Sequence, residues 1–200
     1  VCSSDLLGIL SPEMARLNDI MLELVDSGSK QADIVSLREG SAYRGVVKPR
    51  IHTKITEYPS KGRDFAQFCA KFGMNLMPWQ EWLGEQVLRV KPDGRWVTPV
   101  HTVLIARQNG KSEFMIWQIL YRIFELNEPL IVHTAHKLTT SAEIFYKIYN
   151  IITQHPELEC QLTKKLEARG FQELQFTNGR RYIVRASNSA TRGISQPSSI

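Results

Sequence analysis

A short polar turn that ends in Gly-Lys-Ser is the stretch of this chain that could do chemistry. An apolar run over residues 103–105 leads into Ala-Arg-Gln-Asn-Gly-Lys-Ser at residues 106–112, and a helical pattern follows at once. Strand, Gly-Lys-Ser turn and helix in this order form a loop that binds phosphate, because backbone N–H groups of the turn and of the helix N-terminus point at phosphate oxygens. In such a loop Lys111 reaches the β- and γ-phosphates, and the hydroxyl of Ser112 is a ligand of Mg²⁺.

The first half of the usual phosphate-loop motif is replaced. The full motif is G-x-x-x-x-G-K-[ST], and this chain has Ile105 where the first glycine belongs. Arg107 stands inside the altered loop, where its charge could have a chemical role. The alternative is a loop arginine that pairs with a carboxylate. We favour the chemical role because the part of the loop that departs from the usual motif is the part that contains this arginine.

A second candidate site lies upstream of the loop. Pro78 is typical of the first turn of a helix, and Trp79 and Gln80 follow it. The amide of Gln80 carries a donor and an acceptor, the pair that matches the N6 and N7 edge of adenine, and the indole of Trp79 could stack on the base. The alternative is that Trp79 belongs to the core stripe of its helix. A Pro-aromatic-Gln helix shortly before a phosphate loop favours a nucleotide site.

The carboxyl end of the next expected strand carries His136 and Lys137. In open α/β sheets, ligands bind at the carboxyl ends of the strands. We therefore expect these two side chains on the functional edge of the sheet. The alternative for His136 is a histidine that is buried or hydrogen-bonded for structural reasons.

Apolar periodicity and turn residues predict the elements that must position these residues. We expect a first central strand, buried on both faces, at residues 100–106 and a helix that is apolar on nearly all sides at residues 111–124. The other expected elements are helices at residues 12–26, 63–72, 78–89 and 140–154, a linker at 40–62, a buried strand at 130–135, an exposed helix at 158–168, and a β-hairpin at 174–186 with Asn-Gly at its turn.

Composition sets the broad class of protein. The chain has 200 residues, of which 42% are hydrophobic and 22% charged, enough for one domain with a sizeable core and an extension. The net charge of +5 is compatible with a polyanionic partner. The three cysteines are scattered without a C-x-x-C pair, which indicates reduced thiols rather than disulfides or a zinc site. The sequence contains neither an apolar run of membrane-spanning length nor a signal peptide, so we expect a soluble intracellular chain.

The two ends indicate a piece of a longer open reading frame. The chain starts without methionine, and residues 1–6 look like the translation of a sequencing-adapter remnant, so we leave them out of the expected fold. At the other end the chain stops at Ile200, where a further strand is expected to begin.

Taken in order, these segments resemble the large subunit of tailed-phage terminases, the ATPase that drives genome packaging. Residues 106–112 look like the family's deviant Walker A motif, which lacks the first glycine and carries an arginine. The other matching segments are a lead-in at residues 49–53, an adenine-binding motif at 76–83, a helicase-type coupling segment at 134–143, and the hairpin and loop before the Walker B strand at 178–193.

The resemblance implies a fold and its extent. It implies an α/β P-loop NTPase of the additional-strand type, with a mostly parallel sheet sandwiched by helices and truncated before the Walker B strand. Residues 46–200 would form a partial ATPase domain, with the family's nuclease domain absent. Residues 1–42 match no segment of the family, and we expect residues 1–45 to form a helical N-terminal extension. Because the Walker B aspartate and the adjacent catalytic glutamate are missing, we expect this fragment to bind nucleotide weakly and to hydrolyse little on its own.

The resemblance also implies a function, namely ATP hydrolysis coupled to translocation of double-stranded viral DNA into the procapsid. The expected setting is the bacterial host cytoplasm, docked transiently on the procapsid, with the portal protein, the small terminase subunit and further copies of the chain in a ring as partners. ATP and Mg²⁺ would be the cofactors. Lys111 and Arg107 would be catalytic, and His136, Lys137 and Arg192 would couple hydrolysis to movement. Arg107 would lie next to the γ-phosphate and neutralise charge in the transition state, or it would instead sense a neighbouring copy in a packaging ring. The nucleotide would contact Trp79, Gln80, Ala106, Arg107, Gln108, Asn109, Gly110, Lys111 and Ser112, of which Ser112 would also bind the metal.

Two rival functions remain open at this stage. One is another nucleic-acid-dependent P-loop ATPase such as a superfamily-two helicase, which shares an upstream Gln motif but ordinarily keeps the first glycine of the loop. The other is a non-enzymatic, basic α/β DNA-binding module in which the Gly-Lys-Ser sequence is coincidental. The strand, turn and helix expected around Lys111 favour the ATPase.

Overall fold

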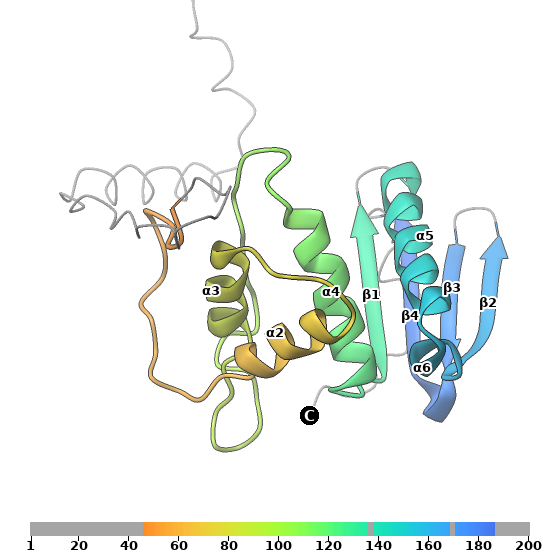
Figure 1. Ribbon diagram of the computed structural model, residues 1–200, viewed down its shortest axis with the longest axis horizontal. Helices are drawn as coiled ribbons and strands as arrows, with labels where there is room; N and C mark the ends of the chain where they lie inside the picture. Colours follow the sequence, from red (N-terminus) through yellow and green to blue (C-terminus); the bar gives the residue numbers. More distant parts are fainter. Residues whose placement is uncertain (1–45, 136–137, 169–170, 187–200) are drawn as a thin grey trace, which may run out of the picture. The chain divides into compact units, whose positions relative to one another are not determined.

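All the described helices and strands lie in one part of the chain. The computed structural model describes residues 46–135, 138–168 and 171–186 (Figure 1). Contacts within the chain divide it into Val1–Glu57 and Tyr58–Ile200, and the second unit contains these elements. In the first unit, the described residues 46–57 form bends and irregular backbone. The domain boundary expected at residue 45 stays a prediction, and the helix expected at residues 12–26 lies outside the described residues.

The second unit contains a mixed four-stranded sheet. Its strands are β1 (Leu130–Ala135), β2 (Leu162–Ala168), β3 (Phe171–Phe176) and β4 (Arg181–Ala186), in the order β1-β4-β3-β2 (Figure 1). Only β1 and β4 pair in parallel, while β4 with β3 and β3 with β2 are antiparallel. The predicted mostly parallel sheet is therefore wrong for the described strands. Two residues separate β2 from β3 and four separate β3 from β4, and connections that short allow only antiparallel pairing.

Four helices were predicted closely. They are α2 (Gly62–Lys71), α3 (Pro78–Val87), α4 (Lys111–Phe124) and α5 (Leu138–Gln154). The predicted all-round apolar character of α4 is confirmed by seven buried side chains, namely Phe114, Ile116, Trp117, Ile119, Leu120, Tyr121 and Ile123.

Aromatic rings join α4 to its neighbours. Phe65 of α2 meets Phe114 and Tyr121 of α4 with ring centroids 5.6 and 5.4 Å apart. At the far end of α4, Phe124 meets Phe176 of β3 at 5.4 Å. Contacts of this kind add to the free energy gained by burying the ring surface. The helix is therefore fixed to α2 along its length and to the sheet at its C-terminal end.

The strand predicted at residues 100–106 is wrong. This segment has no regular structure, and Val100 and Leu104 are 75% and 88% exposed. A strand needs a neighbouring strand to take its backbone hydrogen bonds, and in the described ranges no strand pairs with this segment. The strand predicted at 130–135 is confirmed as β1, but not its complete burial, because Val132 is 37% exposed on a strand with one described neighbour.

The exposed helix predicted at residues 158–168 is also wrong. A single helical turn, α6 (Pro156–Glu159), is followed after two residues by β2, which pairs with β3. Lys165 of β2 packs on α5, with its Nζ 4.1 Å from the ring centroid of Tyr149 and 2.6 Å from Oε1 of Glu167. Pairing with β3 and packing on α5 outweigh the local helical pattern.

The β-hairpin predicted around Asn-Gly is confirmed. Asn178 and Gly179 both have positive φ, at 64° and 75°, between β3 and β4. Asparagine and glycine are the residues that adopt this backbone region most readily, so they suit a tight hairpin turn.

Arg180 follows the hairpin turn and is 3% exposed. Its Nη1 donates to the carbonyl of Ile123 at 2.6 Å and to Oδ1 of Asn127 at 3.1 Å. Its Nη2 donates to Oε1 of Gln161 at 2.8 Å and to Oγ1 of Thr177 at 3.1 Å, and its Nε donates to the carbonyl of Thr177 at 3.1 Å. One side chain thus ties the end of α4 to the start of β2 and to the hairpin, through neutral acceptors.

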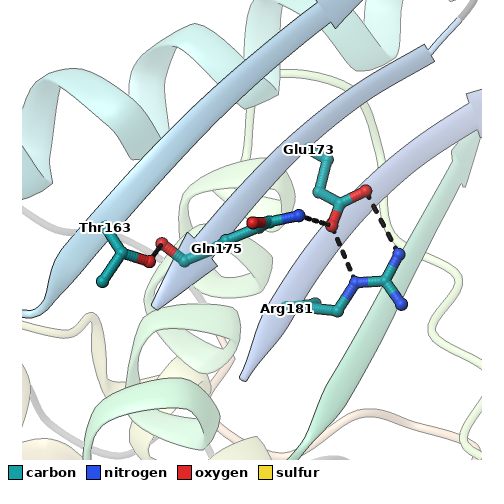
Figure 2. A network of polar contacts seen from close by, with 4 residues as sticks. All are labelled: Thr163, Glu173, Gln175 and Arg181. Carbon is teal, nitrogen blue, oxygen red and sulfur yellow. Dashed lines mark hydrogen bonds and ion pairs between the residues drawn. The ribbon is translucent and has the colours of Figure 1, made fainter. Parts of the chain in front are cut away.

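A second polar network lies on the sheet itself (Figure 2). Arg181 binds the buried Glu173 through Nε at 2.7 Å and Nη2 at 3.2 Å, and Gln175 donates to the same carboxylate at 2.8 Å. Thr163 of β2 donates to the carbonyl of Gln175 at 2.8 Å. Burial raises the pKa of Glu173, but the hydrogen bonds from Arg181 and Gln175 more than offset this effect and hold the pKa below its usual range. The carboxylate therefore stays ionised and cross-links β3 to β4.

We expect Arg180→Ala to lower the free energy of unfolding by about 3 kcal/mol, because it removes five hydrogen bonds, including the one to the buried carbonyl of Ile123. Chemical denaturation measures this change. Arg95→Ala is the matched control, since Arg95 is an exposed arginine paired with Asp93, and it should change stability by less than about 0.5 kcal/mol. Equal losses in the two variants would show that the buried network contributes nothing.

We also expect stability to fall as the pH drops below about 6.5, in part through His133. This β1 side chain is buried, its Nδ1 lies 3.0 Å from the hydroxyl of Tyr182, and burial lowers its pKa from the ordinary value of 6.5. The unfolded chain then binds the proton more readily than the folded chain, so acid favours unfolding by at most about 1.4 kcal/mol per pH unit for one proton.

Unfolding of His133→Gln between pH 5 and 7 checks this prediction. The slope of stability against pH should become shallower but not vanish, because burial and the charge of Arg122 lower the pKa of His101 in the same direction. An unchanged slope would contradict the assignment to His133.

Candidate phosphate-binding site

The loop before α4 has a defined turn. Gln108 and Gly110 both take left-handed backbone conformations, with φ of 64° and 76°. Between them, Nδ2 of Asn109 donates to the carbonyls of Ala106 and Arg107, each at 3.2 Å. Apart from the half-buried Gly110, residues 106–112 are exposed. The loop is therefore folded back on itself and accessible to a ligand.

The N-terminus of α4 is open to an anion. Gly110 is its capping residue and contributes no side chain, and its carbonyl accepts the N–H of Phe114 at 3.0 Å. Lys111 and Ser112 occupy the first two positions of the helix and are exposed. The first N–H groups of a helix have no partner within it and carry the positive end of the helix dipole. This is the arrangement that binds phosphate.

Glu113 is the one acidic residue in the first turn of α4. Its Oε1 accepts a hydrogen bond from Nε1 of Trp117, one turn further along the helix, at 3.2 Å. This bond holds the carboxylate toward the second turn. Sequence reasoning did not single out Glu113, although the spacing of four residues between an acid and an indole donor is a signal of such a contact.

Gln80 does not present its amide to a ligand in this structure. The side chain is fully buried, its Oε1 accepts the N–H of Met77 at 2.8 Å, and its Nε2 donates to the carbonyl of Gly110 at 2.9 Å. Both atoms that were expected to read adenine are therefore engaged within the protein. Trp79 is half-buried with its ring 6.2 Å from that of Phe114, so it packs on α4 as a core-stripe residue does. Contact of Trp79 and Gln80 with a nucleotide stays a prediction.

The structure brings together only part of the predicted site. The α3 residues Trp79 and Gln80 lie against α4 and Gly110, and they share one neighbourhood with residues 106–112. The predicted coupling residues His136, Lys137 and Arg192 lie outside the described residues. Met77 was missed, although its place three residues before Gln80 has the spacing of a capping box.

The donors near the loop fit a loosely held metal ion. Nowhere in the described ranges do three or more His, Cys, Asp or Glu side chains gather as a metal-binding group. Ser112 is an exposed hydroxyl at the helix N-terminus. Mg²⁺ ordinarily takes one or two protein ligands and completes its shell with phosphate oxygens and water. The donor set thus fits Mg²⁺ bound together with a phosphate better than a metal held by the protein alone.

Two further findings concern the described residues as a whole. Cys69 and Cys160 are free thiols, and burial raises the pKa of Cys69 to about 12. No helix in the described part of the chain is both long and apolar enough to cross a membrane.

Comparisons with known proteins bear on the fold. No protein-family model matches the chain, and neither does any curated protein. The crystal structure of the HK97 bacteriophage large terminase matches with a TM-score of 0.50 and 18% identity. The chain shares the fold of a large terminase.

The match covers 69% of this chain and 29% of the HK97 large terminase, so the chain spans less than a third of that protein. The resemblance to a terminase large subunit that the motifs indicate is confirmed at the level of the fold, which is a mixed α/β fold with a four-stranded sheet.

We expect Gly110→Ala to lower the free energy of unfolding by about 2 kcal/mol, because a side chain at φ 76° is strained and its Cβ would lie 3.0 Å from Nε2 of Gln80. Gly94→Ala is the matched control, since Gly94 has a φ of 82° and nothing within 4 Å of the added Cβ. Chemical denaturation should show the larger loss for Gly110→Ala. Equal losses would mean that the contact between Gly110 and Gln80 is loose in solution.

Proposed function

We propose that this chain is the ATP-binding part of a phage terminase large subunit, a motor that couples ATP hydrolysis to movement of double-stranded DNA into a procapsid. The observation that carries the proposal is the exposed, uncapped N-terminus of α4 behind the folded Arg107–Ser112 loop. The similarity of fold to the HK97 bacteriophage large terminase supports the choice among phosphate-binding proteins.

The chemistry asked of this loop is mainly positioning and neutralisation of charge. Backbone N–H groups at the start of α4 would bind phosphate oxygens, and Lys111 would reach the β- and γ-phosphates. Ser112 would hold Mg²⁺, which when bound neutralises charge on the phosphates. Arg107 is exposed one residue before the left-handed Gln108, where its guanidinium would neutralise charge that develops on the γ-phosphate.

Partners and setting belong to the same proposal. Double-stranded DNA, the portal protein, the small terminase subunit and further copies of the chain would be the partners in the bacterial host cytoplasm. The net charge of +5 is compatible with a polyanionic partner. Among the described residues the loop offers no carboxylate group for catalysis beside Glu113, which is bound to Trp117. Binding of nucleotide is therefore the sharper test than its turnover.

We expect Lys111→Ala to weaken binding of Mg·ATP at least tenfold, since the motif places this lysine between the β- and γ-phosphates, where it would contact both. Isothermal titration calorimetry on the whole chain measures this change. Lys91→Ala is the control, because Lys91 is an exposed lysine in the turn between α3 and the loop, and it should leave the affinity unchanged.

Unchanged affinity in Lys111→Ala would refute the phosphate-loop assignment. It would favour the non-enzymatic DNA-binding alternative, in which Gly-Lys-Ser has no chemical role.

A further inference from the structure

Among the described residues, Gln80 is a fully buried polar side chain that contacts the candidate site from another element. It lies in the first turn of α3, and its amide accepts one hydrogen bond and donates another. Oε1 accepts from the backbone N–H of Met77 at 2.8 Å, and Nε2 donates to the backbone carbonyl of Gly110 at 2.9 Å. These partners fix the orientation of the amide, because an N–H needs an acceptor and a carbonyl needs a donor.

The carbonyl of Gly110 is held from two sides. It accepts from Nε2 of Gln80 and from the N–H of Phe114 at 3.0 Å. The peptide unit between Gly110 and Lys111 is planar and trans, so its carbonyl and the N–H of Lys111 point in opposite directions. Holding the carbonyl therefore also sets the direction of the Lys111 N–H, the first free donor of α4.

Close packing reinforces this hold. A Cβ added at Gly110 would lie 3.0 Å from Nε2 of Gln80 and 3.5 Å from the terminal methyl of Met77. Gly110 thus lies against Gln80 of α3 and Met77, the residue that caps this helix, with no room for a larger residue. Helix α3 is itself anchored, because Gly84 lies against the ring of Phe65 in the α2–α4 core.

We propose that Gln80 is a positioning residue for the phosphate loop, which fixes the Gly110–Lys111 peptide so that its N–H faces a bound phosphate, and that it does not read the nucleotide base. This inference rests on the proposed function for the identity of the ligand. Gln80 is fully buried, so reading adenine would require its side chain to move toward the base, and that movement would break its bonds to Met77 and Gly110. Gln80 therefore acts on the triphosphate through the backbone, and its loss affects every triphosphate alike.

Two variants separate the roles of Gln80. Gln80→Met keeps the size of the side chain and removes both hydrogen bonds. Gln80→Glu keeps the acceptor for Met77 but, when ionised, loses the donor to Gly110; when protonated, its hydroxyl can donate again. Gln86→Met is the matched control, because Gln86 lies on the same helix and its Oε1 accepts a hydrogen bond from Nε of Arg89. Thermal unfolding of each variant confirms that it is folded.

The first measurement needs no ligand. Amide hydrogen exchange at residues 106–113 should be at least tenfold faster in Gln80→Met than in the original chain and in Gln86→Met. In Gln80→Glu, exchange at these residues should be faster than in the original chain at neutral pH. At lower pH, where the carboxyl group is protonated, the exchange rates of the variant and of the original chain, measured at the same pH, should become similar. Unchanged exchange in both Gln80 variants would overturn the proposal.

The second measurement compares Mg²⁺ complexes of inorganic tripolyphosphate, ATP and GTP. Gln80→Met should weaken all three at least tenfold and by similar factors. A loss confined to ATP would mean that Gln80 reads adenine, and would overturn the proposal. If the original chain binds none of the three while exchange in the variants is faster, the positioning role stands and the proposed function fails.

Discussion

The burial of α4 on nearly all sides is the constraint on which the candidate site depends. Seven of its side chains are buried, α2 covers it through Phe65, and Phe124 and Arg180 fix its C-terminal end to the sheet and hairpin. A helix held in this way can place only its ends at the surface. Its N-terminal amides therefore face the solvent at a fixed position, which is what a phosphate site requires.

The loop adds a second constraint, because a helix N-terminus alone does not define a site. Two left-handed residues, Gln108 and Gly110, turn the chain sharply before α4. The side chain of Asn109 closes that turn, and Gln80 holds its last carbonyl from α3. The positions of the loop amides thus follow from the packing of α3 on α2 as well as from the loop sequence.

Local signals explain what could be predicted from the sequence. Helix α4, the hairpin turn at Asn178 and the helix that starts at Pro78 each carry a short-range pattern, and the structure contains all three. Features that depend on distant partners were missed or mistaken. The amide of Gln80 suits adenine in isolation, but Gly110 is thirty residues away in sequence and occupies it.

Dependence on distant partners also explains the wrong predictions for the sheet. Residues 162–168 have apolar residues at helical spacing, yet pairing with β3 makes them a strand. Residues 100–106 have the composition of a buried strand, yet no described strand pairs with them. Composition shows that a segment suits a strand, whereas the partner that stabilises it is a property of the whole fold. The five donors of Arg180 likewise find acceptors that no local pattern reveals.

The most direct test of the central claim is to map where a phosphate chain binds. In a titration of Mg²⁺-tripolyphosphate into the isotope-labelled chain, followed by NMR, the account predicts that the backbone N–H signals of Gly110, Lys111 and Ser112 shift most and saturate together. Shifts that concentrate on other segments, or an absence of saturable shifts at the start of α4, would contradict it.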